Sequence, residues 1–332
     1  MITEEVLANL DPKTRARVQK ATEIVIKKQK SPSIGLNLAL KGGFGFGRQI
    51  LLWGNKSAGK SSFCLQMIGE AQKEGKTCAW IDAEQSYDPA WAQKLGVDSE
   101  SLIYSPAKTI NDMVDVATQL MSAGVDIIVV DSISALLPAI YFEKDSEDLK
   151  KLEDTKQIGA EAKDMTHAVK MLNYTNKNTL LILLSQQRNS FGGMHATHIP
   201  TGGMAVKFFS STVVKLWSSE AEANSIKSGI NVGDKIIQQR VGRPVNWSID
   251  YNKLGPQNLE GSYDFYYQGD SLGIDAIGEV ADVAEMMGII QKGGAWYTVG
   301  AERIQGRAKV VEYLKNNPDI VEELRGKIYD KS

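Results

Sequence analysis

The chain has 332 residues, of which 42% are hydrophobic and 23% are charged, a composition typical of a globular protein that can bury a sizeable core. Its formal net charge is -2, so the chain as a whole lacks the basic field that draws some proteins to nucleic acid. Any contact with nucleic acid must therefore come from local elements.

Neither the cysteines nor the apolar segments indicate an exported or membrane-bound protein. Cys64 and Cys78 fall in predicted buried elements and are expected to be free thiols in a reducing compartment, not a disulfide. The first residues are polar and acidic, unlike a signal peptide, and no apolar run is long enough to cross a bilayer. We expect a cytoplasmic protein.

The N-terminal third opens with a polar segment and continues into a candidate strand. Residues 1–30 are rich in Lys and Arg and predict one short helix, which is too small for a core of its own and could pack on another subunit. The alternating segment 35–40 predicts a strand.

The strongest motif spans residues 54–61 and fits the P-loop pattern G-x-x-x-x-G-K-[ST]. An apolar strand is predicted over 49–53 and a helix over 61–71, the context that this motif needs. The glycines let backbone N–H groups point at a phosphate, and the helix N-terminus adds partial positive charge. A chance match in a Gly-rich turn is the alternative. The candidate phosphate-binding residues are Gly54, Asn55, Lys56, Ser57, Ala58, Gly59, Lys60, Ser61 and Ser62.

Three further apolar runs predict buried strands, at 77–82, 126–131 and 180–184. Helices are predicted between them, one of which opens with a capping box at Thr109 and stops at Gly124. Apolar strands separated by helices predict an α/β fold with a mostly parallel sheet and right-handed crossovers.

Polar residues follow each of these strands and are expected to converge. Glu84, Asp131 and Gln186 stand at or just after the strand ends, and ligands of such sheets bind at the carboxyl ends of strands. Asp131 closes an apolar run, the form of a Walker B acid. Lys60 is expected to reach the β- and γ-phosphates, and the Ser61 hydroxyl suits a Mg²⁺ ligand.

The second half of the chain predicts two mobile loops and a small C-terminal domain. The charged segment 143–156 has no clear apolar period, and the Gly-rich segment 189–203 is long enough that a function is expected. Strands are predicted at 212–216 and 247–251, and a helical pattern begins near residue 271.

Taken together, these motifs resemble the bacterial RecA recombinases over nearly the whole chain. The P-loop alone is shared with many NTPases, but the ordered set with a matching C-terminal domain is highly specific. The matching stretches are 54–61, 75–84, 94–97, 128–132, 201–203, 207–208 and 294–297.

The resemblance implies an ATPase site with Mg²⁺. Glu84 matches the catalytic glutamate, and Asp131 matches the acid that holds Mg²⁺ through water; a surface carboxylate is the alternative for Glu84. Asp88 and Trp91 match the residues that bind adenine, with Trp where the family usually has Tyr. Gln186 matches the glutamine that senses the γ-phosphate, and a polar cap on a buried strand is its alternative.

The same resemblance implies two DNA-binding loops, at about 143–159 and 188–200. Lys163 and Lys170 are seven residues apart and share a helix face opposite the apolar stripe, although an ordinary solvated face has this pattern too. Phe191 falls where the family has an aliphatic wedge between base triplets, and packing on the protein's own surface is its alternative. The implied DNA-binding residues are Ile158, Gly159, Lys163, Thr166, Lys170, Arg188, Asn189, Ser190, Phe191, Gly192, Gly202 and Gly203.

The sequence departs from the family at the paired lysines that reach the neighbouring subunit's nucleotide. These positions hold Gln238 and Arg240, so one cation remains, and Arg243 could compensate. The resemblance therefore implies that Arg240 takes part in catalysis across the subunit interface.

These observations predict a RecA-type P-loop NTPase core at 33–270, an N-terminal polymerisation segment at 1–32 and a small α+β C-terminal domain at 271–332. The implied activity is that of a DNA-dependent ATPase that forms a homo-oligomeric helical filament on single-stranded DNA and exchanges strands with duplex DNA. A hexameric helicase with the same core, or a non-catalytic paralogue that loads a recombinase, are the alternatives.

Overall fold

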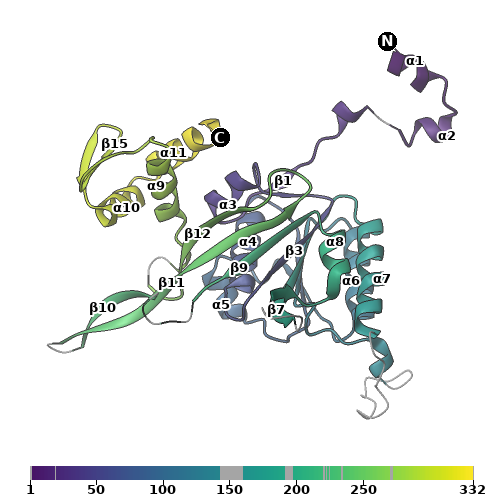
Figure 1. Cartoon of the computed structure of the whole chain (residues 1–332), viewed down its shortest axis with the longest axis horizontal. Coiled ribbons are helices and arrows are strands. Elements are labelled where there is room, and N and C mark those ends of the chain that lie inside the picture. Colours follow the sequence, from purple (N-terminus) through teal and green to yellow (C-terminus); the bar gives the residue numbers. More distant parts are fainter. Residues whose placement is uncertain are drawn as a thin grey trace.

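The computed structural model describes residues 2–18, 20–142, 160–190, 197–219, 221, 223, 225–232, 235–269 and 272–331. A large sheet forms the centre of the molecule, with helices on both faces and a smaller domain beside it (Figure 1). The predicted α/β fold with a mostly parallel sheet is confirmed.

The parallel part of the sheet has the order β9-β3-β7-β6-β4-β5, and antiparallel strands extend it past β9. The parallel strands are β3 (Arg48–Gly54), β4 (Cys78–Asp82), β5 (Leu102–Pro106), β6 (Ile127–Asp131), β7 (Leu180–Ser190) and β9 (Thr212–Trp217). The antiparallel strands are β8 (Thr197–Pro200), β10 (Ile226–Val232), β11 (Lys235–Asn252), β12 (Leu259–Tyr266) and β13 (Gly273–Ile274).

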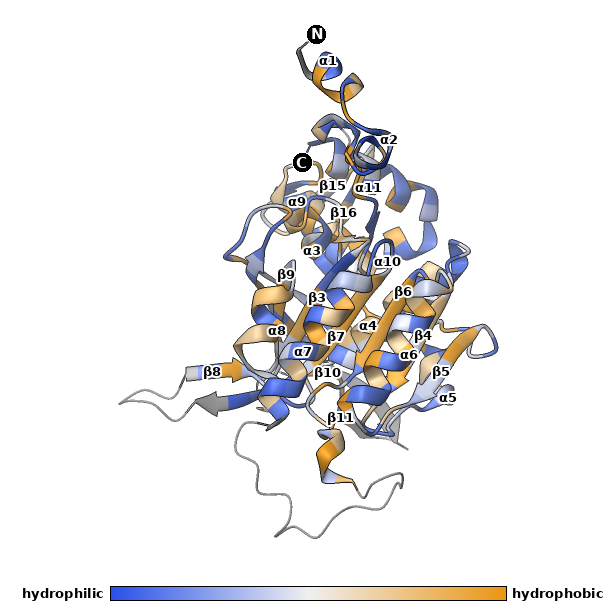
Figure 2. Ribbon diagram, turned by 90° about the vertical axis from the view of Figure 1, so that its right-hand side faces the viewer, coloured by the Kyte–Doolittle hydropathy of each residue, from blue (hydrophilic) through white to orange (hydrophobic). Residues whose placement is uncertain are grey.

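Apolar side chains cover both faces of the sheet, because successive residues of a strand point to opposite sides. Leu52 packs with Phe63 in the layer of helix α4, whereas Leu51 packs on the other face with helices α6 and α7. Figure 2 shows the apolar strands behind these two helices. The core helices are α4 (Lys60–Lys73), α5 (Pro89–Lys94), α6 (Ile110–Ser122), η2 (Ala139–Tyr141), α7 (Ala160–Thr175) and α8 (Gly203–Phe209).

Residues 34–39 form helix α3 (Ile34–Ala39), so the strand predicted over 35–40 is wrong. The Ser33 hydroxyl accepts a hydrogen bond from the Leu36 N–H at 3.1 Å. The Glu279 carboxylate accepts from two further N–H groups of the first turn, each at 3.0 Å. A helix N-terminus needs such partners, and one of them lies 245 residues away in sequence.

The N-terminal segment holds more helices than predicted. Helices α1 (Ile2–Ala8) and α2 (Pro12–Arg15) precede η1 (Ala21–Glu23), so the single helix predicted there is wrong in number. Helices α1 and α2 lie apart from the body of the molecule (Figure 1). Strand β1 (Lys28–Gln29) then joins β2 (Phe44–Gly45) in a separate antiparallel pair.

The C-terminal residues build an α+β unit with its own core. Val280, Leu314 and Leu324 are buried together there, with contributions from all three helices. Its elements are α9 (Ala276–Met286), β14 (Gln291–Gly293), β15 (Trp296–Val299), β16 (Glu302–Gln305), α10 (Arg307–Asn316) and α11 (Pro318–Lys331).

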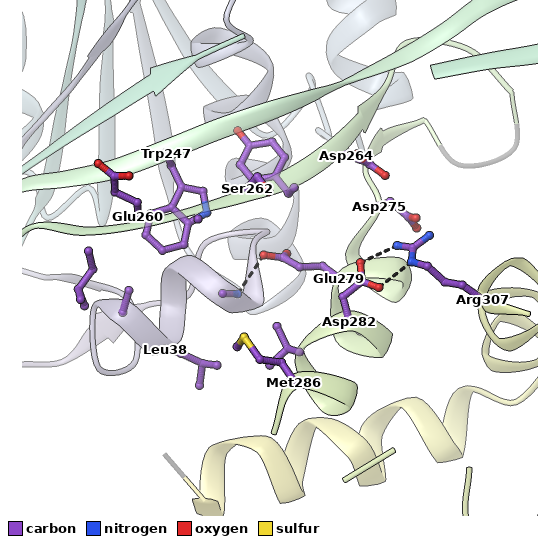
Figure 3. A pocket seen from close by; sticks show the side chains of 16 residues that line it. Leu38, Trp247, Glu260, Ser262, Asp264, Asp275, Glu279, Asp282, Met286 and Arg307 are labelled. Atoms are coloured by element: carbon purple, nitrogen blue, oxygen red, sulfur yellow. Dashed lines mark hydrogen bonds and ion pairs between the residues drawn. The ribbon is translucent and has the colours of Figure 1, made fainter. Parts of the chain in front are cut away.

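A cavity of about 450 Å³ lies where this unit meets the core, between α3, α9, β11 and β12 (Figure 3). Trp247 and Met286 line it, and Arg307 makes a two-pronged ion pair with Asp282, with both contacts at 2.6 Å. Burial raises the pKa of Glu279 to about 7, and hydrogen bonds from Ser33 and the α3 backbone oppose this rise. None of the candidate nucleotide residues lines this cavity.

The described ends of the second predicted loop form β-strands, not loop structure. Strand β7 continues to Ser190 and pairs with β8, so that Arg188 lies opposite Ile199. Residues 191–196 and the first predicted loop, 143–159, lie outside the described residues.

Two further expectations concern the thiols and membrane spans. Cys64 and Cys78 are free and buried, as predicted. Among the helices that the structure describes, none has the length and apolar character to cross a membrane.

Candidate functional site

The P-loop connects the end of β3 to the start of α4 by a tight backbone path. A Cβ atom on Gly54 would lie 1.7 Å from the Leu216 carbonyl oxygen, so only glycine fits there. Gly59 caps α4 in the left-handed conformation, with φ of 83°, and an added Cβ would meet no atom within 4 Å. Asn55 ties the loop to the end of β9, since its side-chain amide donates to the Ser218 carbonyl at 3.0 Å. The loop therefore curls around an open space at the N-terminus of α4, which suits an anion.

Lys60 and Asp131 both line this space. The Lys60 ammonium donates to the carbonyl oxygens of Gly54 and Asn55, at 3.2 and 2.9 Å. Burial lowers the pKa of Lys60, whereas the Asp131 and Glu84 carboxylates raise it. Burial raises the pKa of Asp131 to about 6, and a hydrogen bond with the Ser61 hydroxyl opposes that rise.

Glu84 lies at the carboxyl end of β4 and is held by two donors. The Ser132 hydroxyl donates to its Oε1 atom, and the Gln186 side-chain amide donates to the same oxygen at 2.9 Å. The strand ends of β4, β6 and β7 therefore bring Glu84, Asp131 and Gln186 to one place. Ser132 is a contact that the sequence analysis missed, although it directly follows the predicted Asp131.

Asp82 is a second residue that the sequence analysis missed. It is fully buried and accepts hydrogen bonds from the Glu84 and Tyr87 N–H groups and from the Tyr104 hydroxyl, at 3.2, 3.0 and 3.2 Å. These bonds fix the turn that carries Glu84. Its position, two residues before Glu84 in an otherwise apolar strand, is the signal that could have identified it.

Gln186 also contacts the segment that closes the second predicted loop. Its carbonyl oxygen accepts from both the N–H and the hydroxyl of Thr201, each at 3.0 Å, while its own N–H donates to the Ser134 hydroxyl at 2.9 Å. One residue therefore touches Glu84 through its side chain and, through its backbone, Thr201 in the turn that precedes α8.

These residues enclose a cavity of about 280 Å³. Its lining combines the anion-binding loop with hydroxyl and carboxylate oxygens, the ligands that Mg²⁺ prefers in proteins. The donor set fits a magnesium-bound nucleotide phosphate. The lining residues are Lys56, Ser57, Ala58, Gly59, Lys60, Ser61, Ser62, Glu84, Asp131, Ser132, Gln186 and Arg243.

The predicted adenine-binding pair lies beside the cavity, not in its lining. Asp88 caps helix α5 by accepting from the Ala90 N–H at 2.9 Å. The Trp91 indole N–H donates to the Ser62 hydroxyl at 3.3 Å and its ring packs against the core. This contact brings Trp91 next to the first turn of α4.

The two arginines of β11 differ in their surroundings. Arg243 lines the cavity and its Nη2 atom donates to the Ser57 carbonyl oxygen of the P-loop. Arg240 is exposed and absent from the cavity lining, and its carbonyl oxygen accepts from Gln268 at 2.7 Å. Arg243 was considered above as a substitute for the lost cation across a subunit interface, whereas the structure brings it to the P-loop of its own chain.

The implied DNA-binding residues that the structure describes lie outside the lining of the cavity. Lys163 and Lys170 are exposed on α7, while Met165 and Val169 are buried, as the helix pattern predicted. Thr166 donates its hydroxyl to the Ala162 carbonyl oxygen at 2.7 Å. Arg188 is exposed on β7, which also carries Asn189 and Ser190.

Two glycines and four other positions complete this set. Gly202 has φ of 96°, and a Cβ there would lie 2.9 Å from Ile133, so this turn into α8 requires glycine. Gly203, with φ of 79°, is open to solvent on that side. Ile158, Gly159, Phe191 and Gly192 lie outside the described residues.

Known proteins resemble this chain over almost its full length. The RecA N-terminal domain family matches residues 13–253, and the RecA C-terminal domain family matches residues 278–332. "Protein RecA" of Marinobacter nauticus is 34% identical over 305 residues, which cover 90% of this chain and 82% of that protein. "Protein RecA" of Thermus aquaticus is 34% identical over 306 residues, with 90% and 84% covered. "Protein RecA" of Lactobacillus johnsonii is 34% identical over 318 residues, with 94% and 82% covered.

Proposed function

This chain belongs to the RecA family of DNA-dependent ATPases and recombinases, and on that premise we propose how its own residues couple ATP hydrolysis to a filament on single-stranded DNA. The family binds ATP, and the match to the RecA C-terminal domain distinguishes the chain from a helicase that shares the ATPase core alone. The bound nucleotide lies in the P-loop cavity, between neighbouring subunits of the filament.

Hydrolysis uses the residues at the strand ends. Lys60 binds the β- and γ-phosphates, and Glu84 orients and deprotonates the attacking water. Ser61, through its hydroxyl, and Asp131 would hold Mg²⁺ beside the phosphates. When bound, this ion neutralises negative charge on the phosphate oxygens. The adenine lies against Asp88 and Trp91, since stacking requires only a π face.

Gln186 carries the state of the nucleotide to the DNA. In the described structure its side chain donates to Glu84 and its backbone accepts from Thr201. A γ-phosphate draws the side-chain amide away from Glu84, and the shift moves β7, Thr201 and the loop that they enclose. This is a local switch that needs no long pathway.

The DNA surface combines phosphate contacts with a stacked base ladder. Lys163, Lys170 and Arg188 are exposed cations that bind phosphates, and the backbone N–H groups of Gly202 and Gly203 approach the same strand. Phe191 inserts between bases, where a stacked aromatic contributes about 1–3 kcal/mol per base. Binding is therefore largely independent of sequence and sensitive to salt.

Two parts of the chain act across the subunit interface. Arg240 is exposed and lies outside its own cavity, so it can reach the nucleotide of a neighbour. Residues 1–32, whose helices α1 and α2 stand away from the body (Figure 1), act as the polymerisation segment. The remainder divides into the ATPase core at 33–270 and the C-terminal domain at 271–332.

The observation that carries this proposal is the double contact of Gln186, to Glu84 and to Thr201. Its test is the rate of ATP hydrolysis with and without single-stranded DNA, together with electron microscopy of the DNA-bound protein. We expect stimulation of hydrolysis by DNA and helical filaments. A rate that does not change with DNA, or closed rings in place of filaments, would contradict the proposal.

A further inference from the structure

Arg243 is the one described residue of the P-loop cavity that comes from the antiparallel part of the sheet. The other lining residues belong to the P-loop, to α4 or to the carboxyl ends of β4, β6 and β7. Arg243 lies on β11, 183 residues after Lys60 in the sequence. Its presence in the cavity therefore needs an explanation from the sheet.

The geometry of β11 turns this side chain toward the P-loop of the same chain. From Gly242 to Ile249 the strand pairs with β12 without a register shift, so Arg243, Val245 and Trp247 share one face. Val245 and Trp247 are buried in the same cluster as Phe63 of α4. Arg243 therefore points into the layer that α4 occupies, close to the N-terminus of α4, which directly follows the P-loop.

A bulge in β11 separates Arg243 from Arg240. Lys227 of β10 lies opposite Arg240, but the next residue, Ile226, lies opposite Gly242, which leaves Val241 as an extra residue. Bulges redirect the side chains that flank them. Arg240 lies beyond the bulge on the exposed arm formed by β10 and β11 (Figure 1). The bulge therefore separates an arginine on this arm from one in the cavity.

The guanidinium of Arg243 is only partly satisfied by the protein. Nη2 donates to the Ser57 carbonyl oxygen, while Nε is buried and has no hydrogen-bond partner among the described residues. A guanidinium offers five donors in a planar fork that matches phosphate oxygens. The contact with Ser57 uses only one of these donors, so an incoming phosphate can accept from others at the cavity side of the guanidinium.

Charge in the cavity favours the same ligand. Its described lining carries three cations, Lys56, Lys60 and Arg243, against the carboxylates of Glu84 and Asp131. Without Arg243 the cations and carboxylates would balance, and the preference for an anion would rest on the P-loop backbone alone.

We propose that Arg243 binds the polyphosphate of the nucleotide held by its own subunit, as a cation in cis to the P-loop. The assignment rests on the proposed function only in taking the cavity as the nucleotide site. Arg240 remains the cation that acts in trans, so the loss of a cation at Gln238 is offset from inside the subunit.

The first test measures nucleotide binding to the full chain without DNA, with fluorescent ADP and ATP analogues as probes. We expect Arg243→Gln to weaken binding about tenfold or more, as the loss of a charged hydrogen bond implies, and Arg243→Lys to retain most of the affinity. Gln can still donate to Ser57, so equal affinity of the Gln variant and the unchanged chain would show that Arg243 only anchors the loop and would overturn the proposal.

Melting temperatures without nucleotide guard against a folding defect. Arg243→Lys and Arg243→Gln both keep a long polar side chain, and we expect similar melting temperatures for the two. If the loss of nucleotide affinity in each variant matches its loss of melting temperature, and not its loss of positive charge, the proposal is wrong. This binding assay requires neither filament nor hydrolysis, so it can succeed even where the proposed recombinase function fails.

The second test separates cis from trans by mixing subunits on single-stranded DNA. Every site in a mixture of Arg243→Gln and Lys60→Ala subunits has a damaged P-loop cavity if Arg243 acts in cis, so we expect no recovery of hydrolysis. Recovery toward about a quarter of the normal rate per site would show that Arg243 acts in trans, against the proposal. The matched control is Arg240→Ala mixed with Lys60→Ala, which should recover.

Discussion

The P-loop cavity and the proposed DNA surface are built in different ways, although Gln186 of the cavity also contacts Thr201, next to Gly202. The cavity takes its residues from strand ends and buried turns, where Asp82 is fully buried and Lys60 is only 9% exposed. On the DNA surface, Lys163, Lys170 and Arg188 are exposed, and their positions depend on a helix face and a strand end. A change in the cavity should therefore be severe and local, whereas a change on the surface should be graded.

Lys60→Ala should give the largest effect, because the phosphates lose a cation that the sheet holds in place. We expect hydrolysis to fall by at least about 10³-fold in an ATPase assay with single-stranded DNA. Lys73→Ala is the control, since it removes a lysine from the last turn of the same helix and should leave the rate unchanged. A comparable loss in both variants would mean that α4 is simply unstable to substitution.

Glu84→Gln should separate binding from chemistry within the cavity. The amide keeps the size of the side chain but cannot act as a base, so hydrolysis should fall by about 10²–10³-fold while ATP still binds. The filament should then remain on DNA, as measured by dissociation after dilution. Normal hydrolysis by this variant would show that the base has been misassigned.

Arg240→Ala tests a residue that belongs to neither region of its own subunit. We expect hydrolysis in filaments to fall by about 10–100-fold, the effect of one charged hydrogen bond, with an unchanged melting temperature. Partial recovery on mixing with Lys60→Ala subunits should follow, because each supplies what the other lacks. Full activity of Arg240→Ala alone would remove it from the mechanism.

Gln186→Ala should disconnect the two regions and leave each one working. ATP binding and DNA binding should both remain measurable, but the difference in DNA affinity between the ATP and ADP states should be lost. A typical coupling is about 1–3 kcal/mol, and DNA titrations in the presence of each nucleotide would measure it. If the difference persists, another residue carries the signal.

Lys163→Ala and Lys170→Ala should give the smallest and most graded effects. Each removes one phosphate contact, so the slope of log affinity against log salt concentration should fall by about 0.7 for a single strand. Hydrolysis at saturating DNA should change little. Lys177 lies beyond the end of α7, and Lys177→Ala provides a lysine control that should keep the full slope.

The same contrast explains how far the sequence could predict the structure. The strand ends that carry Glu84, Asp131 and Gln186 were predictable, because apolar runs mark buried strands and parallel strands end at one edge. Strand β5 was missed because its apolar run, Leu102 to Tyr104, is only three residues long; β5 is the last strand of the sheet, where Ile103 and Tyr104 are exposed. The roles on the DNA surface rested on family resemblance, since exposed lysines on a helix carry no pattern of their own.

Other features depended on partners that are distant in sequence. Helix α3 was predicted as a strand because Glu279, which stabilises its first turn, lies far along the chain. The cis position of Arg243 depends on the pairing of β11 with β9 and β12, and a local reading cannot supply that register. The contact of Ser132 with Glu84 could not be predicted, because a serine directly after a strand is common and carries no signal of its own.

The Thr201 contact to the Gln186 carbonyl affects how well this protein can tolerate insertions between β7 and β8 during evolution. Together with the β7–β8 ladder, it pairs the two strands that flank residues 191–196. Lengthening a segment whose ends are fixed is inexpensive, at about 0.6 kcal/mol for each doubling. If residues 191–196 bind DNA as proposed, a change in their number would alter the DNA contacts at little cost in stability, while the cavity residues keep their places.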